Sequence, residues 1–350
     1  MDFNELRKDY LLDRWVVIAT KRARRPTDFA VKEKKQQAKT SACPMCPGNE
    51  HMTPPAVLLY LKKGRALKKA KDRNGIRSKD WLIRVIPNLY PAFTPPSSKT
   101  ETRRIGRSEG LANAVGHHEV IVESPCHDEH PADAGSQQLL HVVNAYLDRL
   151  RALSRKPYIK YVSIFRNYGL DAGASLSHAH SQVIATPFIP KTVEEEMKAS
   201  KKHFKKKGRC IFCEILAKES KSPRFITQNF SFVAFAPYAS VNPMEFWIVP
   251  KKHQVTPLEM SPAEVKAFTV MLKECLAGLK ELVNDPPYNY GFHLALDRKA
   301  RKHYHWHLEV YPKLATWAGF EKSTGVYINT VTPETAAETL RARLKNPPKS

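Results

Sequence analysis

Residues 173–185 read Gly173-Ala-Ser-Leu-Ser-His178-Ala-His180-Ser-Gln182-Val-Ile-Ala, and the rest of the chain is organised around this stretch. Small residues lead into an alternating segment, and the two-residue period of a β-strand places His178, His180 and Gln182 on one face. The glycine ahead of them lets the backbone approach a ligand closely. Two imidazoles and an amide arranged in this way suit phosphate chemistry. A polar strand face with an incidental histidine pair is the alternative interpretation, because short motifs recur by chance.

Length and charge limit the classes of protein to consider. The chain has 350 residues, of which 42% are hydrophobic, and this is enough for about two domains. It contains no stretch of about 18 apolar residues and no N-terminal secretory pattern, so we expect a cytoplasmic protein without a membrane partner.

The net charge of +23 indicates attraction to polyanions, either nucleic acid or a small phosphorylated substrate. Lysine runs are also typical of solvated surfaces, and these runs lack the interleaved aromatic residues that stack on bases, which disfavours nucleic acid.

Four of the six cysteines form two Cys-x-x-Cys pairs, Cys43 with Cys46 and Cys210 with Cys213. In a reducing compartment, pairs with this spacing indicate metal binding before disulfide formation. A redox role is the rival interpretation. It is weaker because two such pairs occur and each has histidines downstream.

The second half of the chain repeats the order of the first. Each half has a cysteine pair, a strand leading to a lone histidine, a helix and an alternating histidine pair. His127 and His253 are 126 residues apart, and His178 and His305 are 127 apart. These matched separations predict an α+β fold built from two copies of one unit, each an antiparallel sheet with helices. The predicted division is an N-terminal unit at residues 1–190, a helical linker at 191–208 and a C-terminal unit at 209–350.

Each copy supplies two cysteines, a distant histidine and the first histidine of the alternating pair. The two sets are Cys43, Cys46, His127 and His178, and Cys210, Cys213, His253 and His305. Zinc accepts two cysteines and two histidines tetrahedrally, and four protein ligands leave no open position. We therefore predict about two structural zinc ions per chain. The alternative is that one or both copies have lost the metal and kept some of the ligands.

If His178 binds zinc, His180 is free for chemistry two residues further along. An imidazole nitrogen can attack the α-phosphorus of a nucleotide and form a covalent nucleotidyl-histidine. A sugar 1-phosphate leaves without needing a proton, whereas an amine or alkoxide would need a general acid. Gln182 cannot supply that proton, but its amide can donate a hydrogen bond to a non-bridging oxygen. The pattern therefore favours transfer between phosphates over hydrolysis.

Several further motifs carry a resemblance to a known family. Over nearly its whole length the chain resembles the galactose-1-phosphate uridylyltransferase family of the histidine triad superfamily, including its ADP-glucose phosphorylase branch. The matching segments are Asp13-Arg-Trp-Val-Val-Ile, Arg22-Ala-Arg-Arg25-Pro, Cys43-Pro-Met-Cys46-Pro-Gly, Pro87-Asn88-Leu-Tyr-Pro, Ser124-Pro-Cys-His127, Asn167 through Gln182, and Gly319-Phe-Glu321.

The resemblance implies two histidine-triad-like units, with His180 as the nucleophile and Gln182 as its phosphate partner. It implies a nucleotide sugar and a hexose 1-phosphate, or orthophosphate, as substrates, and it allows a homodimer. It also implies contacts with the nucleotide, the phosphates or the sugar from Arg22, Arg25, Asn88, Asn167, Gly173, Ser175 and Glu321.

One departure from the family concerns a second metal site. The uridylyltransferases often build it from a glutamate and three histidines, and the candidates here are Glu196, His293 and His307, with Glu309 where the last histidine is expected. The Cys210 set and residues 285–290 and 325–329 resemble the phosphorylase branch instead.

Three hypotheses follow. The first is a nucleotidyltransferase that moves UMP from UDP-glucose to a hexose 1-phosphate such as galactose 1-phosphate, by double displacement. The second uses orthophosphate as the acceptor and an adenine nucleotide sugar as the donor. The third is a non-enzymatic zinc module that binds nucleic acid.

Overall fold

The computed structural model describes residues 4–19, 43–64, 66–73, 75–98 and 113–346. These residues form two compact units. The N-terminal unit contains the described residues from 43 to 166 together with 175–190. The C-terminal unit contains residues 4–19, 167–174 and 191–346. The boundaries predicted at residues 190 and 209 stay a prediction. The division into compact units does not test them, because it does not show where a repeated segment begins.

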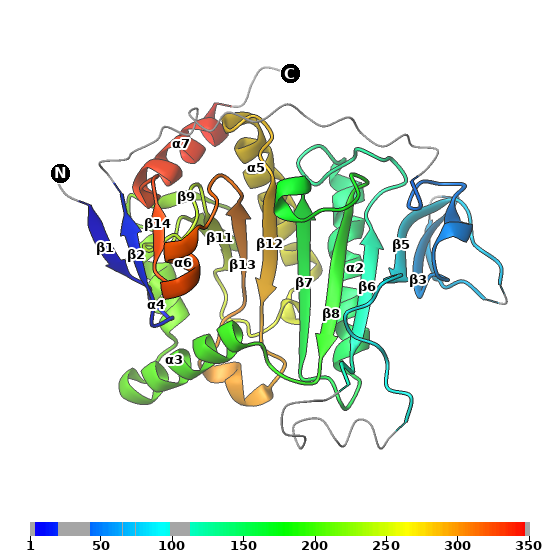
Figure 1. The fold of residues 1–350 in the computed structure, drawn as a ribbon, viewed down its shortest axis with the longest axis horizontal. Coiled ribbons are helices and arrows are strands. Elements are labelled where there is room, and N and C mark those ends of the chain that lie inside the picture. The colour runs from blue at the N-terminus through cyan, green and yellow to red at the C-terminus, as the bar shows by residue number, and fades with distance from the viewer. Residues whose placement is uncertain (1–3, 20–42, 65, 74, 99–112, 347–350) are drawn as a thin grey trace. The chain divides into compact units, whose positions relative to one another are not determined.

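The N-terminal unit is built on antiparallel strands in the order β4-β3-β5-β6-β8-β7 (Figure 1). One long helix, α2, packs against β5, β6 and β8. It forms because its apolar side chains recur at helical spacing and bury one face, from Leu139 to Leu153. The elements are β3 (Leu58–Lys63), β4 (Ala66–Ala70), β5 (Trp81–Pro87), β6 (His117–Val122), α2 (Ser136–Ser154), β7 (Tyr161–Tyr168) and β8 (His180–Thr186).

The C-terminal unit has five antiparallel strands in the order β12-β13-β11-β10-β9 and a small separate sheet, β1-β2-β14. Its longest helix, α5, begins with a capping box between Ser261 and Glu264. The strands are β1 (Glu5–Lys8), β2 (Trp15–Ile18), β9 (Phe225–Gln228), β10 (Phe232–Phe235), β11 (Phe246–Pro250), β12 (Tyr288–His293), β13 (His307–Pro312) and β14 (Tyr327–Asn329). The helices are α3 (Lys191–Lys207), α4 (Ile211–Glu219), α5 (Pro262–Leu282), α6 (Gly319–Thr324) and α7 (Pro333–Lys345).

Both units contain the same succession of strand, long helix, strand and strand. In the N-terminal unit this is β6-α2-β7-β8, and β8 pairs with both β6 and β7. In the C-terminal unit it is β11-α5-β12-β13, and β13 pairs with both β11 and β12. The predicted α+β fold with two similar units, each an antiparallel sheet with helices, is confirmed.

Two local expectations need correction. The sequence of residues 11–20 suggests one strand, but among its described residues, 11–19, the strand comprises only Trp15–Ile18, where β1 and β14 pair with it. His178 was expected within the strand of the histidine pair, but β8 begins at His180. His178 therefore lies in the loop segment immediately before the strand.

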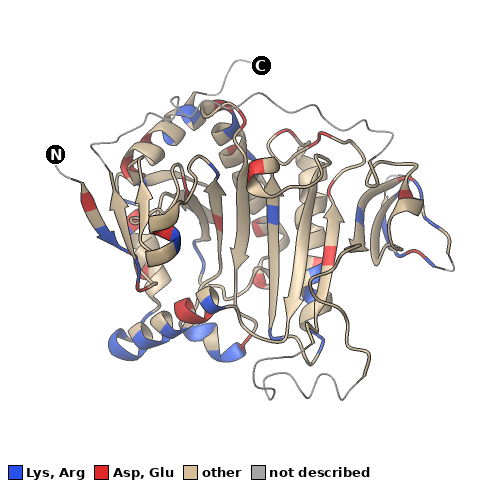
Figure 2. Cartoon of the chain, viewed as in Figure 1, with Lys and Arg blue, Asp and Glu red and all other residues tan. Residues whose placement is uncertain are grey.

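The helix α3 carries many basic residues. Figure 2 marks Lys and Arg positions in blue along it, and its last turn contains Lys205, Lys206 and Lys207. A helix was predicted at residues 191–208, and Val193, Glu196 and Ser200 are its buried residues. No helix in the described part of the chain is both long and apolar enough to cross a membrane.

Candidate active site and metal centres

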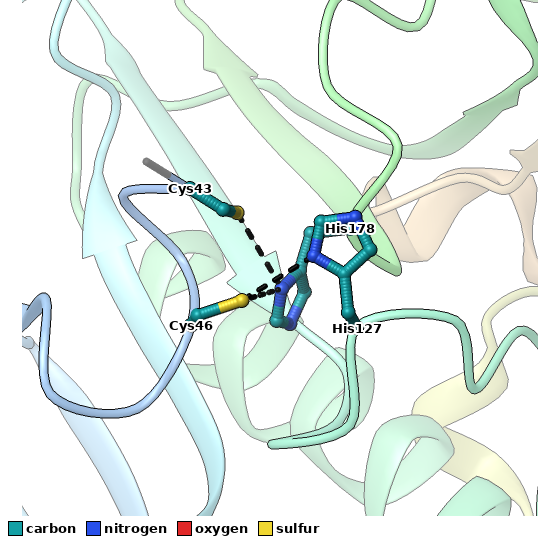
Figure 3. A group of neighbouring side chains, drawn as sticks. All are labelled: Cys43, Cys46, His127 and His178. Atoms are coloured by element: carbon teal, nitrogen blue, oxygen red, sulfur yellow. Dashed lines mark hydrogen bonds between the residues drawn. The ribbon is translucent and has the colours of Figure 1, made fainter. Parts of the chain in front are cut away.

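The first cysteine and histidine set converges in the N-terminal unit, as Figure 3 shows. Cys46 Sγ lies 3.3 Å from His127 Nδ1 and 3.4 Å from His178 Nδ1, and Cys43 Sγ lies 3.7 Å from His178 Nδ1. These separations match the edge of a tetrahedron of zinc ligands, which is about 3.5 Å for usual Zn–S and Zn–N bonds.

The outer nitrogens of both imidazoles are held by other groups. His178 Nε2 donates to the Ser124 carbonyl at 2.8 Å, and His127 Nε2 lies 2.7 Å from Ser177 Oγ. These contacts leave each Nδ1 lone pair directed at the sulfurs, which is the orientation that zinc ligands require. Burial lowers the pKa of His178 to about 4, so this imidazole is neutral, the form that binds a metal. The four residues fit a structural zinc ion.

The second set converges in the same way in the C-terminal unit. Cys213 Sγ lies 3.3 Å from His253 Nδ1 and 3.6 Å from His305 Nδ1, and Cys210 completes the group. His253 Nε2 donates to the Arg301 carbonyl at 2.8 Å, which again turns Nδ1 inward. Cys210 and Cys213 lie at the start of α4, so the helix itself sets their spacing. The donor set fits a second structural zinc ion.

A third group in the described residues contains Glu196, His293, His307 and Glu309, whose donor atoms all lie within 4.8 Å of one another. Glu196 Oε1 lies 2.8 Å from His293 Nδ1, and Tyr304 donates to Glu196 Oε2 at 2.7 Å. Two carboxylates and two imidazoles are donors that divalent transition metals accept. The structure thus brings together the residues expected for the further metal site, with the carboxylate of Glu309 as the departure from three histidines.

His180 is buried on β8 beside the first metal site. Its Nδ1 donates to the His178 carbonyl at 2.7 Å, so the proton of the neutral ring is at Nδ1 and Nε2 carries the lone pair. No hydrogen-bond partner for this Nε2 occurs among the described residues. Burial lowers the pKa of His180, with a smaller contribution from Arg166, so the lone pair is not lost to a proton at neutral pH.

A buried ion pair that sequence reasoning missed supports β8 from the other side. Arg166 pairs with Glu123 and donates to the His180 carbonyl at 3.0 Å. Glu123 also accepts hydrogen bonds from Ser181 and Tyr146. A buried charge is stable only when it is paired with an opposite charge and its remaining polar atoms are hydrogen-bonded. This network therefore fixes the backbone that carries His180. Charged residues within otherwise apolar strands were the signal in the sequence that could have revealed it.

Asn88 and Gln182, two of the predicted phosphate contacts, meet near one imidazole. Asn88 follows β5, and its Nδ2 is 3.1 Å from Nε2 of His118, which itself is 2.7 Å from Gln182 Oε1. Asn88 and Gln182 therefore meet at a histidine that was not predicted to take part.

The Gly-Ala-Ser loop has a backbone that only glycine adopts easily. Gly173 has φ +86, and Asn167 is its neighbour, since a Cβ on Gly173 would lie 3.7 Å from Asn167 Nδ2. Asn289 donates to the Asn167 side chain at 2.8 Å and to the Ala172 carbonyl at 2.7 Å, which holds the loop. Ser175 is exposed.

Glu321 lies in α6, where its Oε2 accepts from the Ala318 N–H at 3.0 Å and so caps the helix, and its predicted contact with the sugar stays a prediction. Arg22 and Arg25 lie outside the described residues.

The described residues combine two similar α+β units with His180, a buried imidazole beside a candidate metal site, and this combination suits group transfer at phosphorus. Comparison with known proteins identifies the family. Residues 115–349 match the family described as "Domain of unknown function (DUF4921)". The chain is 35% identical to ADP-glucose phosphorylase of Arabidopsis thaliana over 345 residues, which are 96% of this chain and 92% of that protein.

Two further similarities cover the chain almost completely. It is 31% identical to galactose-1-phosphate uridylyltransferase of Thermotoga maritima over 348 residues, or 96% of this chain and 98% of the relative. The crystal structure of the Arabidopsis thaliana ADP-glucose phosphorylase with bound ADP-glucose has a TM-score of 0.79 at 32% identity, covering 97% of this chain and 99% of that one. The chain belongs to the galactose-1-phosphate uridylyltransferase family, which includes ADP-glucose phosphorylase, and it is a nucleotidyltransferase.

Proposed function

We propose that the enzyme transfers a nucleoside monophosphate from a nucleotide sugar to a phosphate-bearing acceptor, with His180 as the nucleophile. The observation that carries this proposal is the bond from His180 Nδ1 to the His178 carbonyl at 2.7 Å, which leaves the Nε2 lone pair available. A metal ion bound by His178 would anchor that carbonyl and so fix the direction of the imidazole ring.

The reaction is two in-line displacements at one phosphorus. In the first, His180 Nε2 bonds to the α-phosphorus while the bond from phosphorus to the bridging oxygen breaks, and the sugar 1-phosphate leaves with that electron pair. In the second, an acceptor phosphate oxygen attacks the same phosphorus and the N–P bond breaks. Neither step requires proton transfer, because a phosphate leaves as an anion.

The remaining residues of the proposed site bind and orient the phosphates. The amide of Gln182 donates to a non-bridging oxygen of the transferring group, where negative charge grows in the transition state. Asn88, Asn167, Gly173 and Ser175 contact the nucleotide or its phosphates, and Glu321 contacts the sugar. Arg22 and Arg25 supply positive charge. The zinc ions, about two per chain, are structural and take no part in the displacements.

Two acceptors are supported by different observations. A hexose 1-phosphate with a uridine nucleotide, as in galactose metabolism, is supported by full-length similarity to galactose-1-phosphate uridylyltransferases. Orthophosphate with an adenine nucleotide sugar is supported by 35% identity to the Arabidopsis thaliana ADP-glucose phosphorylase. The convergence of Cys210, Cys213, His253 and His305 adds weight to the second, because this set resembles the phosphorylase branch.

One assay separates the two. The protein is incubated with UDP-glucose or ADP-glucose, each with galactose 1-phosphate or orthophosphate, and the nucleotide products are identified. UDP-galactose indicates the uridylyltransferase, and ADP formed from ADP-glucose and orthophosphate indicates the phosphorylase. Absence of any nucleotide product in all four mixtures would refute nucleotidyl transfer.

We also propose that the enzyme is a homodimer that acts in the cytoplasm. Sedimentation of the purified protein would test the dimer.

A further inference from the structure

We propose that His118 is a positioning residue that decides which end of the Gln182 amide faces the transferring phosphate. The inference rests on the proposed function, in which Gln182 donates a hydrogen bond to that phosphate. His118 lies on β6, which pairs with β8 in a register that sets Val120 opposite Gln182 and His118 opposite Ile184. His118 and Gln182 are therefore diagonal neighbours on the same face of the sheet, within reach of each other's side chains.

The tautomer of His118 follows from its contact with the chain after β5. The backbone N–H of Ala92 donates to His118 Nδ1 at 3.1 Å. A backbone N–H can only donate, so Nδ1 must offer its lone pair and carry no hydrogen. A neutral imidazole has one ring hydrogen, and in His118 it is therefore at Nε2. The Asn88 N–H donates to the His118 carbonyl at 2.9 Å and keeps the two segments in register.

The hydrogen at Nε2 fixes the orientation of Gln182. Nε2 donates to Gln182 Oε1 at 2.7 Å, so the oxygen end of the amide faces the imidazole. The flipped amide would place its NH2 group against the N–H of His118, which is a contact of two donors. The NH2 group is thus directed away from His118, and among the described residues it has no acceptor. It remains available to a phosphate oxygen.

Asn88 is oriented in a similar way at the same imidazole. Its Oδ1 accepts from the Tyr90 N–H at 2.8 Å, which turns Nδ2 toward His118 at 3.1 Å from Nε2. Because Nε2 carries a hydrogen, Asn88 Nδ2 at 3.1 Å is a neighbour of His118 and not a hydrogen-bond partner, whereas Gln182 Oε1 at 2.7 Å accepts the hydrogen. A flipped Gln182 amide would bring a second donor to Nε2, closer than Asn88. The NH2 groups of both amides are thus left to donate to the non-bridging oxygens of a phosphate.

The orientation matters because the two ends of an amide have opposite polarity. With the NH2 group toward the phosphate, the Gln182 dipole stabilises the negative charge that grows on the non-bridging oxygens. With the oxygen toward the phosphate, the same dipole opposes it. Without the bond from His118, the Gln182 amide would populate both orientations. Loss of the single orientation would affect turnover more than substrate binding.

Two substitutions separate positioning from support of the fold. His118→Asn retains an acceptor near the Nδ1 position for the Ala92 N–H, but its side chain is too short to reach Gln182. His118→Gln places an amide donor near the Nε2 position and should restore the bond. We expect His118→Asn to lower kcat about 10- to 100-fold with KM changed less than about threefold, and His118→Gln to recover kcat to within about fivefold of wild type.

The matched control is His117→Asn, at the adjacent residue of β6. His117 faces the other side of the sheet, where its Nε2 contacts the Tyr158 hydroxyl at 2.7 Å. This variant should retain wild-type kcat. In a Gln182→Ala background, His118→Asn should lower kcat by less than about twofold further, because the orientation of Gln182 no longer matters. Equal losses from His118→Asn in both backgrounds would overturn the proposal.

A spectroscopic readout distinguishes failure of this inference from failure of the proposed function. In the 15N-labelled full chain, long-range 1H–15N correlation spectra report the tautomer of each histidine, and His118 is assigned by comparison with His118→Asn. We expect hydrogen at Nε2 of His118 without any substrate present. Hydrogen at Nδ1 would overturn the positioning role, whatever the activity assays show. Wild-type protein with the expected tautomer but no transfer activity would refute the proposed function, and with it the role given to Gln182.

Discussion

The second histidine of the alternating pair has opposite surroundings in the two units. In the N-terminal unit, His180 uses Nδ1 to donate to the His178 carbonyl, and its Nε2 has no partner among the described residues. In the C-terminal unit, His307 places Nδ1 3.3 Å from the His305 carbonyl and Nε2 3.1 Å from Glu309 Oε1. With the same backbone arrangement, Nε2 is left without a partner among the described residues in one unit and faces a carboxylate acceptor in the other.

Two similar units can thus keep the same backbone geometry and present different side chains. Both β8 and β13 begin at the second histidine of the pair, and both follow a metal-site histidine two residues earlier. The residue two positions further on differs: Gln182 in one strand and Glu309 in the other. A carboxylate at this position binds the imidazole and would repel a phosphate, whereas an amide does neither.

The largest expected difference between the units is in the two histidines themselves. His180→Ala should lower the exchange of labelled sugar 1-phosphate into nucleotide sugar by at least about ten-thousand-fold, because it removes the nucleophile. His307→Ala should leave exchange within about tenfold of wild type. It should instead lower the stability by about 2–4 kcal/mol, because the buried His307 ring stacks on Trp247 at 4.7 Å.

Acid-labile label from the nucleotide sugar provides the decisive check on the intermediate. The label should be found on wild-type protein and on His307→Ala, and not on His180→Ala. Label that persists without His180, or kinetics that require both substrates to be bound at once, would falsify the assignment.

The next prediction concerns the charge at position 182. Gln182→Glu reproduces the residue of the C-terminal unit, and it should lower kcat about a thousand-fold because the carboxylate binds His180 and repels phosphate. Gln182→Arg should lower kcat less, by about a hundred-fold. The guanidinium still donates hydrogen bonds, but it is larger and overstabilises the charged intermediate. Steady-state kinetics, with circular dichroism to verify the fold, would measure both. If Gln182→Glu turned over normally, the difference between the units would have another cause.

The metal sites should differ in their effect on activity. Elemental analysis of purified protein should find about two zinc ions per chain in these two sets, and Cys43→Ser and Cys210→Ser should each remove one. Both should lower the thermal midpoint by about 10 °C or more, because a structural zinc contributes its binding energy to folding. Only Cys43→Ser should also abolish exchange at temperatures where the variant is folded, since its site anchors His178. A folded wild-type protein without zinc would contradict both assignments.

The smallest predicted effect is the acid sensitivity of the N-terminal unit. Burial, aided by Lys156 and Arg149, lowers the pKa of His117 to about 4, against about 6.5 in an unfolded chain. Between these values the unfolded state binds more protons, so the stability that depends on neutral His117 is complete above pH 6.5 and is lost as the pH falls toward 4. His117→Gln should therefore lose less thermal stability than wild type between pH 7.5 and pH 5. Parallel curves for the two proteins would show that His117 does not titrate in this way.

The sequence predicted those features that depend on local pattern and ligand chemistry. The repeated order of the two halves predicted a strand before His253 and a helix after it, and the structure confirms both as β11 (Phe246–Pro250) and α5 (Pro262–Leu282). The cysteine and histidine spacing predicted two sets of four donors, and both sets converge. These features were readable because each depends on residue type and on distance along the chain.

The tertiary structure alone decided the features that depend on pairing between distant segments. Tyr327–Asn329 pairs in parallel with Trp15–Ile18, about 300 residues earlier, and no local pattern reveals this partner. The hydrogen at Nε2 of His118 depends on a backbone N–H from another loop, at Ala92. Sequence named His180, Gln182 and Asn88 but not His118, because a side chain's neighbours, tautomer and orientation depend on which groups the fold places next to it.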